Sequence, residues 1–119
     1  MELIAVFDDI PPEGLRFRYH DGPFEEMAIL LKLADGEVRA YKNECRHLPM
    51  RLDDREPQEL WDQSRTHLVC SSHGARYRPA DGLCVSGPCK NSHLKALPVV
   101  VKDGQVFLET EKIGSFFDL

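Results

Sequence analysis

The chain has 119 residues and a mass of 13.6 kDa, which allows one domain with a single core and excludes a large enzyme. Hydrophobic residues make up 42% and charged residues 29% of the sequence, so neither a disordered nor a fibrous protein is expected. Fifteen Lys and Arg against twenty Asp and Glu give a formal net charge of -5. This charge disfavours nucleic acids and anionic membranes and favours a basic or neutral partner.

The sequence gives no sign of targeting to a membrane or for secretion. Residues 1–10 contain no basic segment ahead of an apolar run, and the longest apolar stretch, 27–31, is too short to span a bilayer. We therefore expect a cytoplasmic protein. In a reducing compartment, four cysteines indicate metal ligands or buried thiols more than a disulfide framework.

The predicted elements are short strands joined by tight turns. In chain order, β-rich runs occupy 3–7, 15–19, 27–33, 37–41, 67–70, 75–78, 83–85, 97–102 and 105–109. Asp-Gly pairs at 35–36, 81–82 and 103–104 lie between such runs and predict hairpins, because glycine accepts a positive φ. No hairpin is assigned to the fourth pair, at 21–22. Only 54–62 suits a helical turn, which Pro57 keeps short.

This pattern predicts an all-β fold, a small antiparallel sandwich or barrel, in a single domain spanning 1–119. No repeat, low-complexity tract or linker interrupts the sequence. One continuous domain is the simplest organisation.

Two Cys/His pairs carry the chemical information. Cys45-Arg46-His47 and Cys70-Ser71-Ser72-His73 are separated by 22 residues, and each offers one thiolate and one imidazole from a predicted loop. Two such loops can converge at one end of a sheet and clamp a metal. A zinc ion is possible, although a Cys-x-His spacing is tight for one tetrahedral ion. A two-iron cluster suits the pattern better, since each loop can send its Cys to one iron and its His to the other.

The motifs Cys45-x-His47 and Cys70-x2-His73-Gly74 resemble the ligand pattern of Rieske iron-sulfur proteins, particularly the small soluble Rieske-type ferredoxins. Residues 82–88 are similar to the strand and Gly-Pro loop that covers the cluster in that family, and the resemblance extends from about 3 to 108. It implies a Rieske fold with cluster-binding loops at about 43–50 and 70–89, and one [2Fe-2S] cluster per chain. Cys45 and Cys70 would ligate the inner iron, and His47 and His73 the outer iron.

The resemblance also assigns roles around the cluster. Tyr77 matches a tyrosine that hydrogen-bonds the cluster region, with a plain core aromatic as the alternative, and Pro88 would exclude water or only shape its loop. High-potential members have a disulfide where this chain has Met50 and Ser72, and a hydroxyl where it has Ala75. With fewer hydrogen bonds to sulfur, we expect a reduction potential of roughly -150 mV rather than +300 mV.

The remaining cysteines and histidines have simpler expected roles. Cys84 and Cys89 flank the Gly-Pro loop and have no neighbouring histidine, so buried thiols lining the cluster are favoured over ligands, with a redox-active pair as the alternative. His20, His67 and His93 are expected to be solvated or structural.

The resemblance implies an electron-transfer protein with no catalytic residues. It would carry one electron from a reductase to a terminal oxygenase or other redox enzyme, and only about thirty residues follow the cluster region, too few for an oxygenase catalytic domain. Two alternatives stay open: a Rieske-like small subunit of a nitrite-reductase-type complex, and a zinc-stabilised binding module without a redox role.

Overall fold

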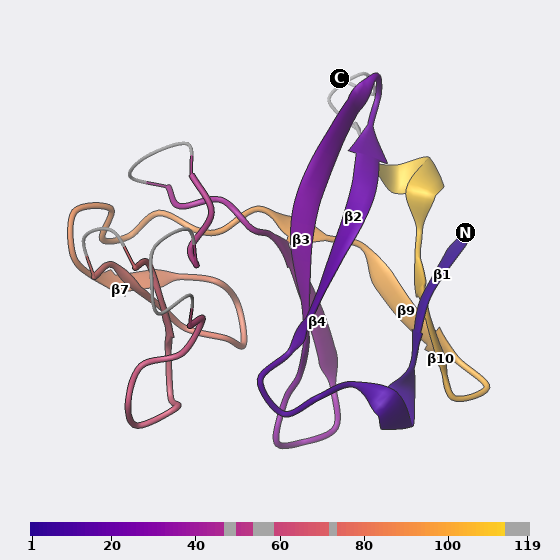
Figure 1. Ribbon diagram of the computed structural model, residues 1–119, viewed down its shortest axis with the longest axis horizontal. Coiled ribbons are helices and arrows are strands. Elements are labelled where there is room, and N and C mark those ends of the chain that lie inside the picture. Colours follow the sequence, from indigo (N-terminus) through magenta and orange to yellow (C-terminus); the bar gives the residue numbers. More distant parts are fainter. Residues whose placement is uncertain (47–49, 54–58, 72–73, 114–119) are drawn as a thin grey trace. The chain divides into compact units, whose positions relative to one another are not determined.

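The computed structural model describes residues 1–46, 50–53, 59–71 and 74–113, and these residues form a nearly all-β structure (Figure 1). The elements are β1 Glu2–Val6, η1 Phe7–Asp9, β2 Leu15–Asp21, β3 Phe24–Lys32, β4 Val38–Lys42, β5 Leu68–Val69, β6 Arg76–Tyr77, β7 Cys84–Ser86, β8 Ala96–Leu97, β9 Val99–Lys102, β10 Gln105–Leu108 and η2 Thr110–Lys112, where η marks a 3-10 helix. The predicted all-β class is confirmed. No helix in these described ranges is long and apolar enough to cross a membrane.

The chain forms two compact units. The first unit combines Met1–Ala40 with Leu97–Leu119, and the second is the intervening segment Tyr41–Ala96. The strands form three sheets, with the orders β1-β10-β9, β2-β3-β4-β8 and β5-β6-β7. That the whole chain acts as one domain stays a prediction.

The first unit has a continuous apolar core. In β2 the side chains alternate, so that Tyr19 is buried while Arg16, Arg18 and His20 face solvent. Alternate residues of β10 also point inward, which buries Val106 and Leu108. The core consists of Ile10, Tyr19, Ala28, Leu30, Val38, Ala40, Leu97, Val106 and Leu108.

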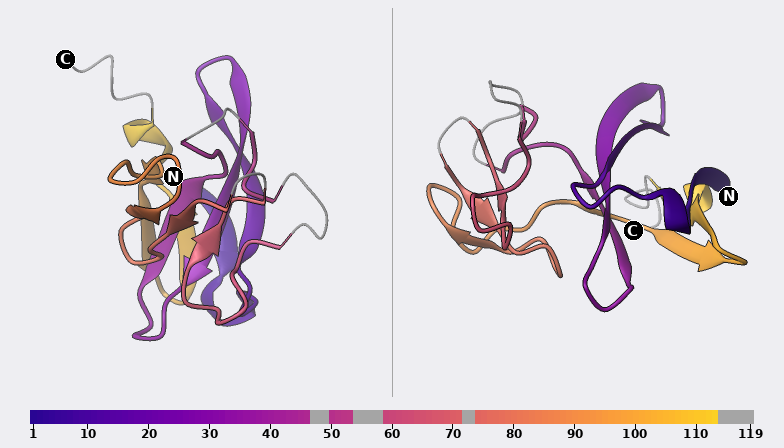
Figure 2. Two further views of the ribbon diagram at one scale, coloured as in Figure 1. Left: turned by 90° about the vertical axis from the view of Figure 1, so that its left-hand side faces the viewer. Right: turned by 60° about the horizontal axis from the view of Figure 1, so that its bottom comes forward.

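The three predicted hairpin turns are confirmed, and the structure contains a fourth hairpin that was not predicted. Strands β3 and β4, β6 and β7, and β9 and β10 are adjacent in their sheets around the expected Asp-Gly pairs. The fourth pair, Asp21-Gly22, starts the turn of the longest hairpin, in which Asp21 of β2 pairs with Phe24 of β3 (Figures 1 and 2). Exposed side chains contact each other across this hairpin, since Arg18 and His20 lie 3.6 and 3.9 Å from Glu25.

The second unit contains the small β5-β6-β7 sheet and the loops around it. Leu68 pairs with Tyr77 and also forms an isolated bridge with Trp61. The predicted helical turn at 54–62 is wrong for its described part, since 59–62 is not helical and Trp61 is drawn into this pairing. Residues 54–58 of that prediction lie outside the described residues.

Candidate metal centre

The first cysteine loop follows β4 and is fastened by backbone and side-chain hydrogen bonds. The N–H of Cys45 donates to the carbonyl of Met50 at 2.7 Å. Below it, the buried Asn43 accepts from the N–H of Leu52 at 2.9 Å and donates to the carboxylate of Asp53 at 3.0 Å. The Cys45 side chain is buried at 3% relative exposure. These hydrogen bonds hold the Cys45 thiol in the interior of the second unit.

The second cysteine loop connects β5 with β6, and two backbone hydrogen bonds join its described residues. The N–H of Cys70 donates to the carbonyl of Ala75 at 2.8 Å, and the N–H of Gly74 donates to the carbonyl of Cys70 at 2.9 Å. Cys70 is buried at 1% relative exposure. This loop therefore holds a second buried thiol.

The two loops are bonded to each other, as the sequence pattern predicts. The N–H of Ser71 donates to the carbonyl of Leu52 at 2.7 Å, which joins the residue after the second cysteine to the closing segment of the first loop. The N–H of Val69 donates to the carbonyl of Leu60 at 2.8 Å. Backbone hydrogen bonds of this kind fix the spacing of the two loops without using either thiol.

Tyr77 of β6 places its hydroxyl against the first cysteine loop. The hydroxyl lies 3.5 Å from the Sγ of Cys45 and 3.0 Å from the Sγ of Cys89, and it accepts the N–H of Arg46 at 3.1 Å. Burial, reinforced by the contacts with the two cysteines, raises the pKa of Tyr77 above its usual range, while the bond from Arg46 lowers it. The hydroxyl therefore keeps its proton and can donate to sulfur. The Tyr77 ring is also fully buried, as the core-aromatic alternative requires, and a role of its hydroxyl beside a cluster stays a prediction.

Cys84 and Cys89 lie side by side. Their Sγ atoms are 3.1 Å apart, and Cys84 donates to the carbonyl of Ser86 at 3.3 Å. Cys84 is buried, as expected, whereas Cys89 is only partly buried. Burial and the neighbouring Cys89 raise the pKa of Cys84 to about 11. None of the four cysteines forms a disulfide.

The Gly87-Pro88 segment packs on the second cysteine loop. Gly87 has a φ of +95°, and a Cβ on it would lie 2.8 Å from the Cα of Ala75. Only glycine permits this close approach. Pro88 is exposed to solvent in the described structure. The predicted Gly-Pro loop is therefore in contact with the residues that follow Cys70.

The donors in the described residues fit part of the predicted ligand set. Cys45 and Cys70 are buried thiols on loops that hydrogen-bond to each other, and soft thiolates in such a site suit an iron-sulfur centre. The predicted ligands His47 and His73 lie outside the described residues. Within the described ranges, no three His, Cys, Asp or Glu side chains group closely enough to hold a metal ion.

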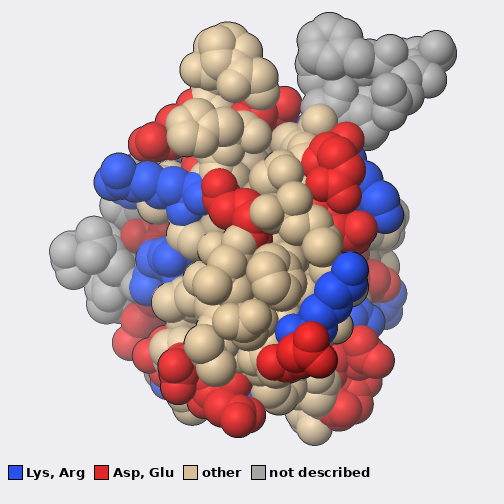
Figure 3. Space-filling view, turned by 90° about the vertical axis from the view of Figure 1, so that its right-hand side faces the viewer, with Lys and Arg blue, Asp and Glu red and all other residues tan. Residues whose placement is uncertain are grey.

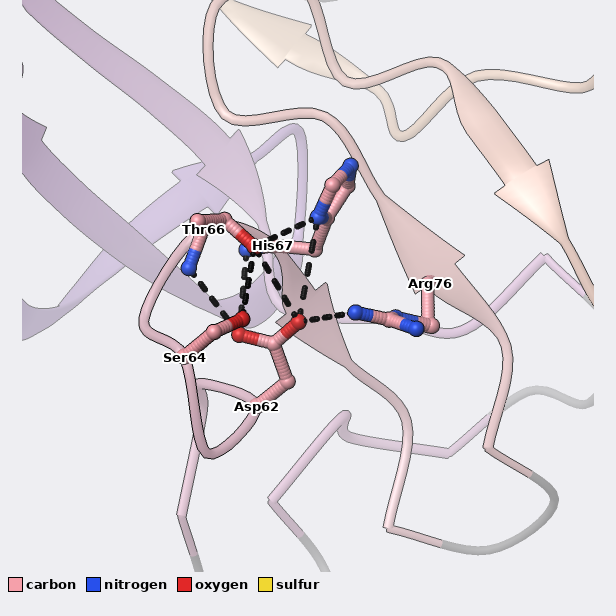
Figure 4. Close-up of polar contacts among 5 residues, drawn as sticks. All are labelled: Asp62, Ser64, Thr66, His67 and Arg76. Atoms are coloured by element: carbon pink, nitrogen blue, oxygen red, sulfur yellow. Dashed lines mark hydrogen bonds and ion pairs between the residues drawn. The ribbon is translucent and has the colours of Figure 1, made fainter.

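A separate polar cluster surrounds Asp62 (Figure 4). Its carboxylate accepts the N–H groups of Thr66 at 3.0 Å and His67 at 3.3 Å, and it forms an ion pair with Arg76 of β6. Burial acts to raise the pKa of Asp62, but the bonds from Arg76, Thr66 and His67 outweigh it and lower the pKa below its usual range. Nδ1 of His67 lies 2.9 Å from the Oγ1 of Thr66 and 3.7 Å from Asp62, which matches the structural role expected of His67.

Two features around the cysteine loops were not predicted from the sequence. The burial of Asn43 has no signal in the sequence, because an Asn between strand and loop is ordinarily exposed. The contact between Cys89 and Tyr77 follows from the pairing of β6 with β7, which spacing alone does not define.

Comparison with known proteins identifies the family. The model of the Rieske [2Fe-2S] domain matches residues 8–106. No curated protein matches the sequence. The ferredoxin of carbazole 1,9a-dioxygenase from Nocardioides aromaticivorans IC177 is 21% identical, with a TM-score of 0.65 over 89% of this chain and 93% of that one.

Two further solved structures share the fold. A ferredoxin from Sphingomonas yanoikuyae B1 is 24% identical, with a TM-score of 0.63 over 91% of this chain and 95% of that one. The terminal oxygenase of carbazole 1,9a-dioxygenase from Novosphingobium sp. KA1 is 24% identical, with a TM-score of 0.66 over 89% of this chain and 28% of the oxygenase. The chain belongs to the Rieske [2Fe-2S] domain family, which implies one [2Fe-2S] cluster per chain.

Proposed function

We propose that the chain is a one-electron carrier, a Rieske-type ferredoxin that passes electrons from a reductase to a terminal oxygenase or another redox enzyme. Cys45 and Cys70 would ligate the inner iron, and His47 and His73 the outer iron. The observation that carries the proposal is the pair of buried thiols on two mutually hydrogen-bonded loops, with a tyrosine hydroxyl 3.5 Å from the Sγ of Cys45. We assign no catalytic residue to the chain.

The residues around the thiols would tune this centre. When bound, a [2Fe-2S] cluster supplies a reversible one-electron couple. The Tyr77 hydroxyl, oriented by the N–H of Arg46, can donate to the Cys45 sulfur and offset negative charge there. Ala75 is buried and has no hydroxyl to add a second such bond. This environment supports a potential toward the low end of the Rieske range.

The partner assignment rests on similarity. One solved neighbour, 21% identical over 89% of this chain, is described as a complex of reduced oxygenase and oxidized ferredoxin in carbazole 1,9a-dioxygenase. By analogy, this chain would dock transiently on an oxygenase after reduction by a reductase, with Pro88 beside the cluster. The family match spans both compact units, which supports a single functional domain of residues 1–119. A cytoplasmic location is part of the same proposal.

The first experiment measures iron, sulfide and zinc in freshly purified protein and records an electron paramagnetic resonance spectrum after reduction with dithionite. We expect two irons and two sulfides per chain and an anisotropic signal with a low average g value. One zinc per chain and no signal would overturn the electron-carrier proposal in favour of a zinc-stabilised module.

Histidine variants test the ligand assignment with matched controls. His47→Ala and His73→Ala should each lose the cluster or alter its spectrum, whereas His67→Ala and His93→Ala should keep the wild-type spectrum. An unchanged spectrum for either of the first two variants would remove that histidine from the ligand set.

A further inference from the structure

Two thiols in the second unit form a pair that the proposed electron transfer does not use. Cys84 of β7 and Cys89 of the following turn have Sγ atoms 3.1 Å apart. The backbone fixes both positions, because the N–H of Asn91 donates to the carbonyl of Cys84 at 2.9 Å and the N–H of Ser92 donates to the carbonyl of Cys89 at 3.0 Å. A disulfide requires the sulfur atoms to approach to about 2.05 Å. Only a small movement of the side chains separates this pair from a disulfide.

The two thiols differ in exposure. Cys84 is fully buried, with a relative exposure of 0%, whereas Cys89 is partly open to solvent. Cys89 is therefore the more exposed residue of the pair and the one placed to meet an external reagent, with Cys84 behind it. An accessible cysteine beside a buried resolving cysteine is the arrangement that thiol–disulfide exchange needs.

We propose that Cys84 and Cys89 form a thiol–disulfide exchange site that takes low-molecular-weight disulfides and is linked to the cluster ligand Cys45 through the Tyr77 hydroxyl. In the first step the Cys89 thiolate attacks one sulfur of the small disulfide, whose S–S bond breaks and releases one thiol. In the second step the Cys84 sulfur loses its proton and attacks the Cys89 sulfur of the mixed disulfide formed in the first step, whose S–S bond breaks and releases the second thiol. The two protein thiols are oxidised, the small disulfide is reduced, and the two protons end on the released thiols.

The link to the cluster rests on the proposed function. In the dithiol state the Tyr77 hydroxyl lies closer to the Sγ of Cys89, at 3.0 Å, than to the Sγ of Cys45, at 3.5 Å. Formation of the disulfide draws Cys89 toward Cys84 and leaves Cys45 as the remaining sulfur partner of the hydroxyl. A stronger hydrogen bond to a ligand sulfur favours the reduced cluster. The midpoint potential is therefore higher in the disulfide form.

The test treats the protein as purified, whatever its cluster content, with oxidised glutathione, denatures it, and counts the thiols that react with N-ethylmaleimide by mass spectrometry. Wild type should lose two of its four reactive thiols, with both losses in the peptide that contains Cys84 and Cys89. Cys84→Ala should instead retain one glutathione on Cys89, and Cys89→Ser should show neither adduct nor thiol loss. Four reactive thiols in treated wild type, or an adduct in Cys89→Ser, would overturn the exchange site.

A second measurement tests whether the Cys84–Cys89 disulfide changes the midpoint potential of the cluster. The midpoint potential of the treated wild type should rise above that of the untreated protein, and the rise should be absent in Cys89→Ser and in Tyr77→Phe. A disulfide that leaves the midpoint of a loaded cluster unchanged would refute the link through Tyr77. Because thiol counting does not depend on the cluster, failure of the exchange site is distinguishable from failure of the electron-carrier proposal.

Discussion

Two side chains without any ligand role hold Cys45 in place. Asn43 uses both ends of its amide, accepting from Leu52 and donating to Asp53, so that a polar group is buried without loss of hydrogen bonding. The Tyr77 hydroxyl accepts the N–H of Arg46 and can donate to the Cys45 sulfur. Each interaction acts on the loop backbone or on the thiol itself. A substitution that removes one polar atom from either residue therefore tests the contribution of its hydrogen bond.

Tyr77→Phe removes the hydroxyl and keeps the buried ring. We expect the cluster midpoint to fall by about 60 mV if the lost hydrogen bond is about 1.4 kcal/mol stronger in the reduced state. Protein-film voltammetry measures this shift. Tyr41→Phe is the matched control, because the Tyr41 hydroxyl of the same unit donates at 2.7 Å to the carbonyl of Pro79. Equal shifts in both variants, or none in Tyr77→Phe, would contradict a direct bond to the Cys45 sulfur.

At the scale of elements, the residues of the tight turns were the best guide to which strands pair. An Asp-Gly pair between apolar runs correctly predicts the hairpin of β9 and β10, where Lys102 pairs with Gln105. The same dipeptide before Pro23 starts the β2–β3 turn, but charged residues such as Arg18 and Glu25 interrupt the flanking sequence, so no continuous apolar run marks the two strands there. Spacing also predicts that the two cysteine loops meet. It does not predict the Gly87 contact with Ala75, which depends on tertiary packing.

Gly87→Ala tests this packing between the Gly-Pro segment and the second cysteine loop. Its Cβ would meet the Ala75 backbone at 2.8 Å in addition to the strain of a φ of +95°. We expect a loss of about 1–3 kcal/mol in stability, measured by denaturant unfolding followed through cluster absorbance. Gly36→Ala is the control, since Gly36 has a φ of +88° but no atom within 4 Å of the added Cβ. The same loss in both variants would show that backbone strain alone decides.

The Asp62 cluster makes the attachment of the 62–67 turn to β6 sensitive to pH. Because folding lowers the pKa of Asp62, its stabilising effect is present above the unfolded-state pKa of about 3.9 and is lost as pH falls toward the lower folded value. Asp62→Asn should therefore reduce the thermal stability of the loaded protein at pH 7, with a smaller reduction near pH 3. Melting curves across this range measure the effect. Asp8→Asn is the control for the change of one charge, and an equal response to pH in the two variants would disprove the role of Asp62.

For the whole molecule, net charge conceals an unequal distribution. The segment Tyr41–Ala96, which contains all four cysteines, has nine Lys and Arg against seven Asp and Glu. The remainder has six against thirteen, and carboxylates border the face of the first unit on which β1, β9 and β10 lie (Figure 3). The total of -5 suggested a basic or neutral partner. The charge of the cysteine-containing unit instead favours an acidic docking surface, because short-range fields dominate at physiological salt.

Small redox reagents of opposite charge can separate these two expectations. If the local charge governs encounter, oxidation of the reduced cluster by anionic hexacyanoferrate(III) should slow several-fold between about 0.01 and 1 M salt, as the Debye length falls from about 30 to 3 Å. A cationic cobalt(III) hexaammine oxidant should show the opposite trend. Lys90→Glu, an exposed site beside Cys89, should weaken the salt dependence for hexacyanoferrate(III) more than Lys102→Glu, an exposed site in the first unit. Faster oxidation by hexacyanoferrate(III) at high salt would show that the net negative charge of the chain governs the approach of a partner.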